Sequence, residues 1–253
     1  MRHCVIALLL LLGAHTAVSD DTPVTDTRQP LTFNISPGGY PPFTIAHPDG
    51  SVSGIFWDTL QIITDRLDLR LEPIEIPPKR SDSLLNQGYS DVTMRAIEWA
   101  ANPEEFLFTD ALMMTRDAIF VHHASPGTID DVNDLQGTLL TRLGFRYPWL
   151  DARLQDGAVS IIPVQQQVSL FRRLYHGGHR FTGAVSNVHA GYWVLRNNPS
   201  WKDHISEAPI RLDEVAFRLM LPPRHADLVP LINAELARMR QSGELAAIIE
   251  SYQ

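Results

Sequence analysis

Cysteine is almost absent: Cys4 is the only cysteine among 253 residues. A lone cysteine excludes an intrachain disulfide and a metal site built from several thiolates. Common catalytic signatures are missing as well, because the sequence has no H-E-x-x-H, G-x-S-x-G, Walker or G-x-G-x-x-G motif. We therefore expect no metal, no cofactor and no catalytic residue of these kinds.

Positive charge is also scarce. The chain has 21 Lys and Arg against 29 Asp and Glu, a net charge of −8, and a sequence pI near 5.6. A nucleic-acid-binding protein needs a basic surface to neutralise phosphates, so this balance argues against nucleic acid as a partner. The hydrophobic fraction of 44% is that of a globular protein, and the length suits one large domain or two small ones.

Long hydrophobic runs are missing except at the amino terminus. Residues 5–12 are apolar, follow Arg2 and His3, and precede the small-residue stretch at positions 17–19. This pattern is typical of a secretory signal and is too short for a membrane span. We predict a signal peptide over residues 1–19 and a leader over residues 20–27, and hence a periplasmic protein without membrane insertion after cleavage. The mature chain would keep 253 − 19 = 234 residues and no cysteine.

The first hundred residues alternate between strand and helix patterns. Residues 31–36, 69–76 and 91–94 are predicted strands, and residues 55–67 and 81–87 are predicted helices. This order is typical of a parallel sheet with helices on its faces.

A second strand–helix series follows without a long Pro-, Ser- or Gly-rich linker. The predicted strands are residues 118–121, 138–141, 182–185 and 217–221, and the predicted helices are 168–175, 188–196 and 228–249, the last broken at positions 242–243. Two series without such a linker indicate two lobes joined by strand-like crossovers.

Six motifs in a fixed order now point to a known family: G-G-Y-P-P-F at 38–43, D-G-S-V-S-G-I-F-W-D at 49–58, G-Y-S-D at 88–91, F-T-D at 108–110, D-L-Q-G at 134–137, and the tail from position 231. Together they resemble the family 3 bacterial solute-binding proteins, the periplasmic receptors of polar-amino-acid ABC importers. The resemblance implies an α/β, two-lobed type II periplasmic-binding-protein fold, with mixed, mostly parallel sheets, helices on both faces and two crossover strands as the hinge. Lobe 1 would comprise residues 28–117 plus 213–253, and lobe 2 residues 118–212.

The resemblance also implies how such a protein works. A small molecule binds in the cleft between the lobes and stabilises the closed state, which is then presented to an inner-membrane ABC permease. We expect a monomer that binds a small polar solute, an amino acid or a related organic molecule, and has no enzymatic activity.

Aromatic residues near the first predicted strand are candidate ligand contacts. Tyr40 and Phe43 lie in the loop after that strand, where loops line the crevice of an open α/β sheet. Trp57 at the start of the first helix would form a wall of the same pocket. The alternative for all three residues is packing in the loop or against the sheet.

Polar candidates follow the third predicted strand. Thr93 and Arg95 lie near its end, and the Arg95 guanidinium is suited to a carboxylate. Glu98 could belong to the same wall. The alternative for Arg95 is a salt bridge to Glu98, Glu104 or Glu105.

In lobe 2 the candidates follow two other strands. Arg142 and Tyr147 lie in or beside a glycine-bearing turn, and Ser186 and Asn187 follow the strand at 182–185. The alternative is that Arg142 and Tyr147 are exposed loop residues. In related receptors an Asp for the ligand's ammonium usually stands at the position of Asn187.

Two departures from the family pattern bear on the ligand. The Arg that grips the α-carboxylate in related receptors falls near Asn102 or Pro103, and the ammonium-binding Asp is replaced by Asn187. An unpaired charge in a dry cleft is costly. The solute is therefore not an ordinary α-amino acid unless Arg95 and Glu98 rebuild the clamp.

Two other functions remain open. Some relatives, such as periplasmic cyclohexadienyl dehydratases, are enzymes on this scaffold, and Glu98 is the acid we would nominate for such chemistry. A sensory role, with the receptor docked on a membrane signalling protein, is the other. The histidine pairs at 122–123 and 176–179 are interpreted as solvated turns rather than metal sites.

Overall fold

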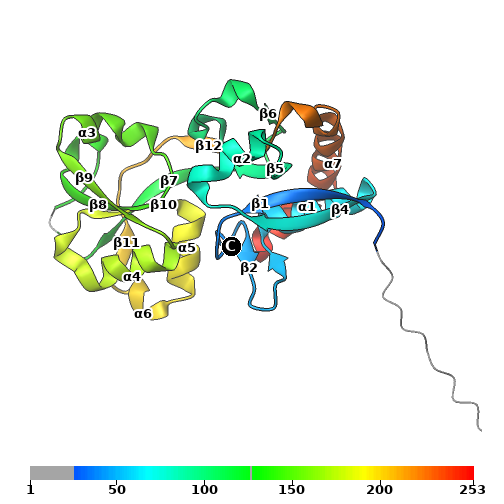
Figure 1. Cartoon of the computed structure of the whole chain (residues 1–253). Coiled ribbons are helices and arrows are strands. Elements are labelled where there is room, and N and C mark those ends of the chain that lie inside the picture. The colour runs from blue at the N-terminus through cyan, green and yellow to red at the C-terminus, as the bar shows by residue number, and fades with distance from the viewer. Residues whose placement is uncertain (1–25, 126) are drawn as a thin grey trace, which may run out of the picture.

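The structure is a computed structural model that describes residues 26–125 and 127–253. The predicted signal peptide over residues 1–19 and most of the predicted leader over residues 20–27 lie outside the described residues. Figure 1 shows two lobes side by side, connected by long strands. This confirms the predicted two-lobed α/β fold.

The first lobe is built on parallel strands. Strand β1 pairs in parallel with β4 on one side and with β5 on the other. The strand order is β4 (Leu69–Glu75), β1 (Gln29–Ile35), β5 (Val92–Arg95) and β12 (Glu214–Leu221), with β6 (Leu107–Phe108) beside β12. A small hairpin joins β2 (Ile45–Ala46) and β3 (Val52–Ser53). Its helices are α1 (Ile55–Arg66), α2 (Ser81–Asn86), α7 (Leu228–Ser242) and α8 (Glu244–Ser251).

The second lobe repeats this arrangement. Strand β8 pairs in parallel with β9 and β10, while β10 and β11 pair antiparallel with β7. The strand order is β7 (Met113–His122), β10 (Gly183–Asn187), β8 (Gly137–Arg142) and β9 (Val159–Val164), with β11 (Ile205–Glu207) on the other side of β7. Its helices are α3 (Asp151–Gln155), α4 (Gln167–Gly177), α5 (Val188–Arg196) and α6 (Pro199–Lys202).

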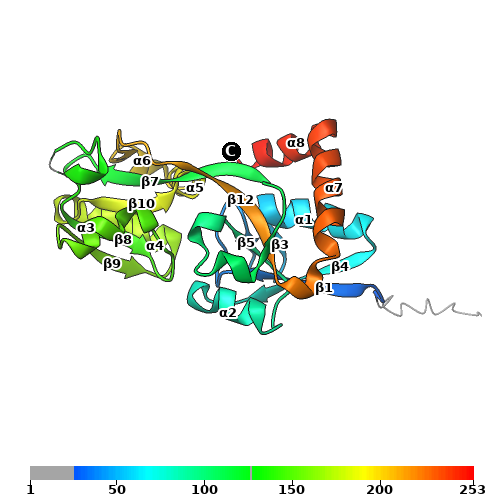
Figure 2. The same ribbon diagram turned by 90° about the horizontal axis from the view of Figure 1, so that it is seen from above.

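Two strands cross between the lobes. Strands β7 and β12 pair antiparallel from Glu214 opposite Arg116 to Phe217 opposite Met113, and Figure 2 shows both running along the length of the molecule. They are the crossovers of the predicted fold, because β7 leads into the sheet of the second lobe and β12 returns to that of the first.

Each lobe has its own hydrophobic core. In the first lobe, α1 turns Ile55, Leu60 and Ile63 inward, and all three are fully buried. This spacing places one apolar face of the helix on the sheet. Ala190 of α5, which belongs to the second lobe, packs in the same cluster, so the two lobes are in contact.

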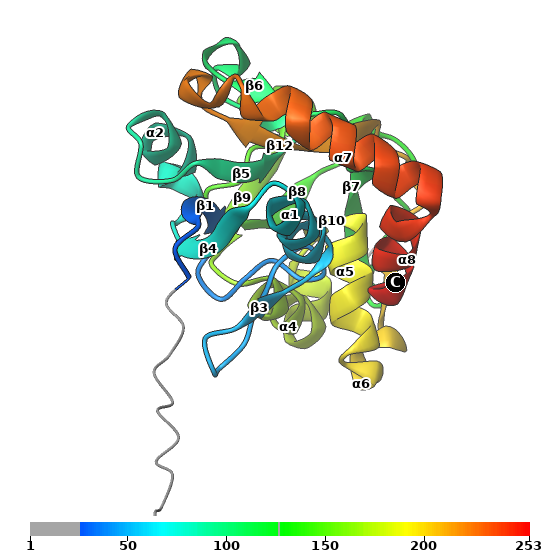
Figure 3. The same ribbon diagram turned by 90° about the vertical axis from the view of Figure 1, so that its right-hand side faces the viewer.

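The carboxyl-terminal helices cover the first lobe and reach the second. The break predicted at positions 242–243 is confirmed, because Gly243 adopts a φ of 81° between α7 and α8. Figure 3 shows α7 lying across the first lobe, with α8 and the carboxyl terminus beside α5.

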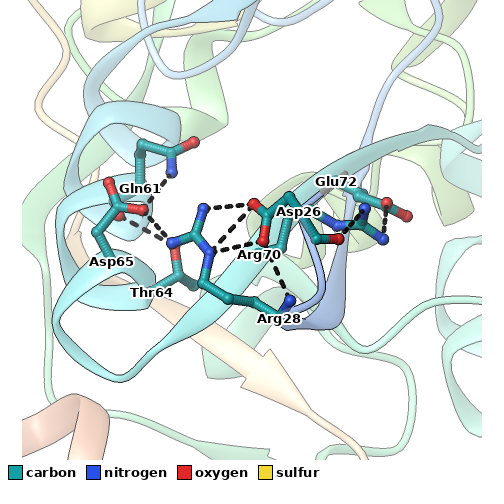
Figure 4. A network of polar contacts seen from close by, with 7 residues as sticks. All are labelled: Asp26, Arg28, Gln61, Thr64, Asp65, Arg70 and Glu72. Atoms are coloured by element: carbon teal, nitrogen blue, oxygen red, sulfur yellow. Dashed lines mark hydrogen bonds and ion pairs between the residues drawn. The ribbon is translucent and has the colours of Figure 1, made fainter. Parts of the chain in front are cut away.

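A polar network fixes the start of β1 (Figure 4). Arg28 donates to Asp26 and to Asp65 of α1, both at 2.7 Å, and Arg70 of β4 pairs with Glu72 at 2.7 Å. The Arg28 guanidinium lowers the pKa of Asp26 to about 2. The network joins β1 to the helix and the strand beside it.

Short 3-10 helices connect several elements: η1 (Pro78–Arg80), η2 (Ile97–Trp99), η3 (Pro103–Glu105), η4 (Val132–Asp134), η5 (Pro148–Leu150), η6 (Gly178–Arg180) and η7 (Pro223–His225). Within the described residues, no helix combines the length and the apolar character that a membrane crossing requires.

Candidate functional site

A cavity of about 490 Å³ lies between the two lobes. Segments of both lobes line it, including the ends of β1 and β5 and the loop that follows β8. Five of the ten predicted ligand residues are in its wall: Tyr40, Thr93, Arg95, Tyr147 and Asn187. The cavity size is in the range of small-molecule sites.

Asp117 is an acidic residue of the cavity wall that the sequence analysis did not predict. It lies on β7, is 6% exposed, lines the cavity, and is the register partner of Asn187 on β10. Trp149 Nε1 donates to its Oδ2 at 3.0 Å, and burial raises its pKa to about 6. The signal was present in the sequence, where Asp117 directly precedes the apolar residues of the predicted strand at 118–121.

Asn187 has a local structural role. It is the N-cap of α5, where its Oδ1 accepts from the backbone N–H of His189 at 3.0 Å. Its Nδ2 donates to Thr115 Oγ1 at 2.6 Å. Because both ends of the amide already have partners, Asn187 shapes the cavity wall more than it offers free hydrogen-bonding groups.

Aromatic rings form one side of the cavity. The rings of Tyr40 and Phe145 meet at 5.2 Å in an edge-on arrangement, and Tyr147 lies nearby in the same wall. Burial raises the pKa values of both Tyr40 and Tyr147, so their hydroxyl groups stay protonated at neutral pH. Flat or cationic ligand groups pack well on such rings.

Basic residues also line the cavity. Arg95 forms an ion pair with Asp82 of α2, rather than with one of the glutamates considered from the sequence. Lys79 and Arg146 also line the cavity, and Arg146 Nη1 donates to the carbonyl oxygen of Ala100 at 3.4 Å. Arg95 reaches Asp82 because β5 ends beside the first turn of α2.

Four other predicted contacts lie outside the wall. Phe43 and Trp57 belong to the core of the first lobe, where the Phe43 ring packs on Phe217 at 5.0 Å. This is the packing alternative considered for both residues. Glu98 is exposed on η2, and buried Ser186 donates to the carbonyl oxygen of Asn187 at 2.8 Å.

Arg142 is not the exposed loop residue that one alternative described. It is the last residue of β8, is only 4% exposed, and lies behind Tyr40 and Phe145. It lines a second cavity of about 230 Å³ instead of the large one. In the described part of the chain, it makes no ion pair.

Besides the Tyr40–Phe145 pair, other contacts join the lobes. Gly144 of the second lobe lies close to Lys79 of the first. A Cβ atom at position 144 would lie 3.0 Å from the backbone nitrogen of Lys79. Arg146 contacts Ala100, as described above. Arg196 Nη2 of α5 donates to the carbonyl oxygen of Tyr252 at 2.7 Å.

The histidines considered as metal ligands are not gathered into a cluster. The rings of His122 and His204 stack at 5.8 Å, and burial lowers the pKa of His122. Across residues 26–125 and 127–253, no group of three or more His, Cys, Asp or Glu side chains is arranged to hold a metal ion.

Comparison with known proteins supports the fold. The family model of the bacterial extracellular solute-binding proteins, family 3, matches residues 34–253. No curated protein matches the chain in sequence.

Three similar solved structures come from proteins of different kinds. An ABC uptake transporter substrate-binding protein from Streptococcus pneumoniae with bound histidine has a TM-score of 0.74, 16% identity, and coverage of 88% of this chain and 92% of that one. A histidine kinase sensor domain similar to periplasmic binding proteins has a TM-score of 0.75, 19% identity and coverage of 90% and 97%. An ancestral amino-acid-binding protein, a precursor of cyclohexadienyl dehydratase, has a TM-score of 0.73, 15% identity and coverage of 88% and 94%. At such low identity these likenesses show the fold alone.

Proposed function

The chain belongs to family 3 of the bacterial extracellular solute-binding proteins, and from this premise we propose that it captures a small polar solute, an amino acid or a related organic molecule, between its lobes. The observation that carries the proposal is the cavity of about 490 Å³ between the lobes, lined from both sides. A ligand that contacts both lobes stabilises their closed arrangement by its differential affinity for that state.

Acidic and basic side chains in the cavity wall support a solute that carries both a cationic and an anionic group. Buried Asp117, beside the rings of Tyr40 and Tyr147, suits a cationic group such as an ammonium. Lys79 and Arg95, from the first lobe, suit an anionic group. The charge lost at position 187 relative to related receptors would thus be supplied by Asp117.

The rest of the cycle follows the pattern of the family. We infer that the protein is exported with residues 1–19 as its signal, acts as a monomer in the periplasm, and delivers its solute to an inner-membrane ABC importer. Movement would occur in β7 and β12, near the lobe boundaries that the sequence predicts at 117–118 and 212–213. Lobe 1 would then be residues 28–117 plus 213–253, and lobe 2 residues 118–212.

A thermal-shift screen of the purified protein against amino acids, amines, organic acids and small peptides tests the proposal. A ligand that binds only the folded state raises stability by about 2.7 kcal/mol at a hundredfold excess over its Kd. Calorimetry on each hit then gives stoichiometry and affinity. If no compound of these classes shifts the unfolding temperature, the proposed ligand class is wrong.

One observation favours an enzymatic alternative. Asp117, with its pKa raised to about 6 in a cavity wall, has the property of a general acid or base, whereas Glu98 is exposed and lies outside that wall. Conversion of a candidate solute, followed by chromatography, would support a dehydratase-like enzyme; unchanged solute after long incubation would support a receptor. A sensory role is distinguished by testing whether the loaded protein binds a permease or a membrane signalling protein.

A further inference from the structure

The second cavity, of about 230 Å³, lies between segments of both lobes. The loop at residues 37–41 supplies its wall from the first lobe. The start of α4 and the end of α5 supply the wall from the second, and Arg142 completes it. Tyr40 and Phe145, which line the large cavity, lie against the Arg142 guanidinium at 5.4 and 5.1 Å, so this second cavity is behind their rings.

Arg142 is a buried cation without a neutralising acid. It is 4% exposed, its Nε has no hydrogen-bond partner, and no carboxylate within the described residues forms an ion pair with it. Among residues 26–125 and 127–253, its one side-chain hydrogen bond is a long contact of 3.5 Å from Nη1 to Gln167 Oε1. Aromatic rings attract a guanidinium but leave its charge unneutralised, and a buried ion without a counter-charge is strongly disfavoured.

The remaining wall also suits a negative charge. Helix α4 begins at this cavity with no side-chain cap and no acidic residue in its first turn, so its free backbone N–H groups carry the partial positive charge of a helix start. Gln167 is held in place because its Nε2 donates to Ser186 Oγ at 2.5 Å. That bond leaves the amide oxygen facing Arg142.

We propose that the second cavity is a binding site for one small monovalent anion, of the size of chloride or a short carboxylate, held by Arg142 and the start of α4. This site is separate from the solute site and holds its own ligand. Because segments of both lobes line it, the bound anion favours their closed arrangement.

Thermal unfolding of the purified protein without any solute tests this inference. Sodium chloride and sodium acetate are titrated against sodium gluconate at constant ionic strength. We expect a saturable rise in Tm, roughly 5 °C at about a hundredfold excess over Kd. A response to acetate alone assigns the site to carboxylates, and a response to both assigns it to small anions in general. The same rise in all three salts, or no rise in any, would overturn the proposal.

Variants place the response at this cavity. Gln166→Glu sets a carboxylate at the N-cap of α4, where it replaces the anion, so the variant loses its dependence on chloride and acetate. Gln165→Glu makes the same charge change one residue earlier, outside the cavity wall, and keeps the full response. Arg142→Gln removes the cation and also abolishes the response. A full response in Gln166→Glu would refute the site even if Arg142→Gln failed to fold.

Because the titration contains no solute, its outcome is independent of the proposed transport function. An anion response in a protein that binds no amino-acid-like solute would refute the proposed solute and leave the anion site standing. Solute binding without an anion response would do the reverse.

Discussion

Asp117 lies directly opposite Asn187 in the antiparallel pair of β7 and β10, and both residues line the large cavity. Residues paired in this way stand about 5 Å apart between their Cα atoms. Position 187 is where related receptors usually carry the acid for the ligand's ammonium. In this chain an acid stands on the neighbouring strand instead, and Asn187 is the N-cap of α5.

The first prediction concerns this acid. Asp117→Asn keeps the shape of the side chain and removes its charge, so we expect a cationic solute to bind roughly 10- to 100-fold more weakly. Titration calorimetry with a hit from the thermal-shift screen measures the effect. Asp213→Asn, an exposed carboxylate just before β12, serves as the control and should change nothing. Equal affinities in wild type and Asp117→Asn would remove Asp117 from the site.

Stability should depend on pH through the same group. Because burial raises the pKa of Asp117 to about 6 from 3.8, the folded state favours its protonated form. Its contribution to the free energy of unfolding is therefore full below about pH 4 and is lost as pH rises through 6, a change of up to about 3 kcal/mol.

The difference between wild type and Asp117→Asn isolates this contribution. Asp91 has a lowered pKa and acts with the opposite sign, since it stabilises at neutral pH and loses that effect as pH falls below its ordinary range. Asp91 is present in both proteins, so its contribution cancels in the difference between their free energies of unfolding. Urea unfolding at several pH values should show that the free energy of unfolding of Asp117→Asn rises relative to that of wild type between pH 4 and 7. A constant difference between the two proteins would contradict the raised pKa.

Arg95 and Asp82 form the third test. Arg95→Ala should weaken an anionic or zwitterionic solute about 10- to 100-fold, because the guanidinium is a charged donor in the cavity wall. Asp82→Asn removes the partner of Arg95 and should strengthen binding of the same solute. Calorimetry on the two variants gives opposite signs if Arg95 meets the ligand. Changes of the same sign would mean that the ion pair only supports the fold.

Local patterns were sufficient to predict much of the fold. The helix predicted over residues 188–196 is confirmed at both ends as α5, because its apolar face and its N-cap are encoded in neighbouring residues. Strand β9 (Val159–Val164) was not predicted. It lies at the edge of its sheet, contains Pro163, and exposes Ile161 and Ile162, so it lacks the alternation that marks a half-buried strand.

The candidate site was predictable in position but not in pairing. Strand ends placed Tyr40, Thr93 and Asn187 at the cleft, because loops after parallel strands meet at one edge. The pairing of Arg95 with Asp82 and the burial of Arg142 depend on how separate segments pack. The spacing of residues along the chain does not determine that packing. Asp117 was missed because β7 is longer than its apolar run.

A fourth prediction concerns the contact between α5 and the carboxyl terminus. Arg196 joins the lobes through the carbonyl oxygen of Tyr252. Arg196→Ala should therefore lower the population of the closed state and weaken solute binding by roughly fivefold. Small-angle scattering should also give a larger radius of gyration without solute. Arg172→Ala removes a similar exposed arginine from α4, away from the interface, and should leave both measurements unchanged.

The last prediction separates two effects of replacing a glycine by alanine: strain in the backbone and obstruction of the closing of the two lobes. Gly144 and Gly157 have φ values of 85° and 75°, so alanine at either position costs about 1 kcal/mol of folding stability. The two sites differ in their surroundings. A Cβ at position 144 would meet Lys79 Cγ at 2.9 Å across the cleft, whereas one at position 157 has nothing within 4 Å.

Gly144→Ala should consequently weaken solute binding while Gly157→Ala should not. If the closed population falls about tenfold, the apparent affinity falls by the same factor. Calorimetry reports the affinity and urea unfolding reports the stability of each variant. A loss of affinity in both variants would attribute the effect to strain within the second lobe, and a loss in neither would mean that the lobes do not need to approach at Gly144 for the solute to be held.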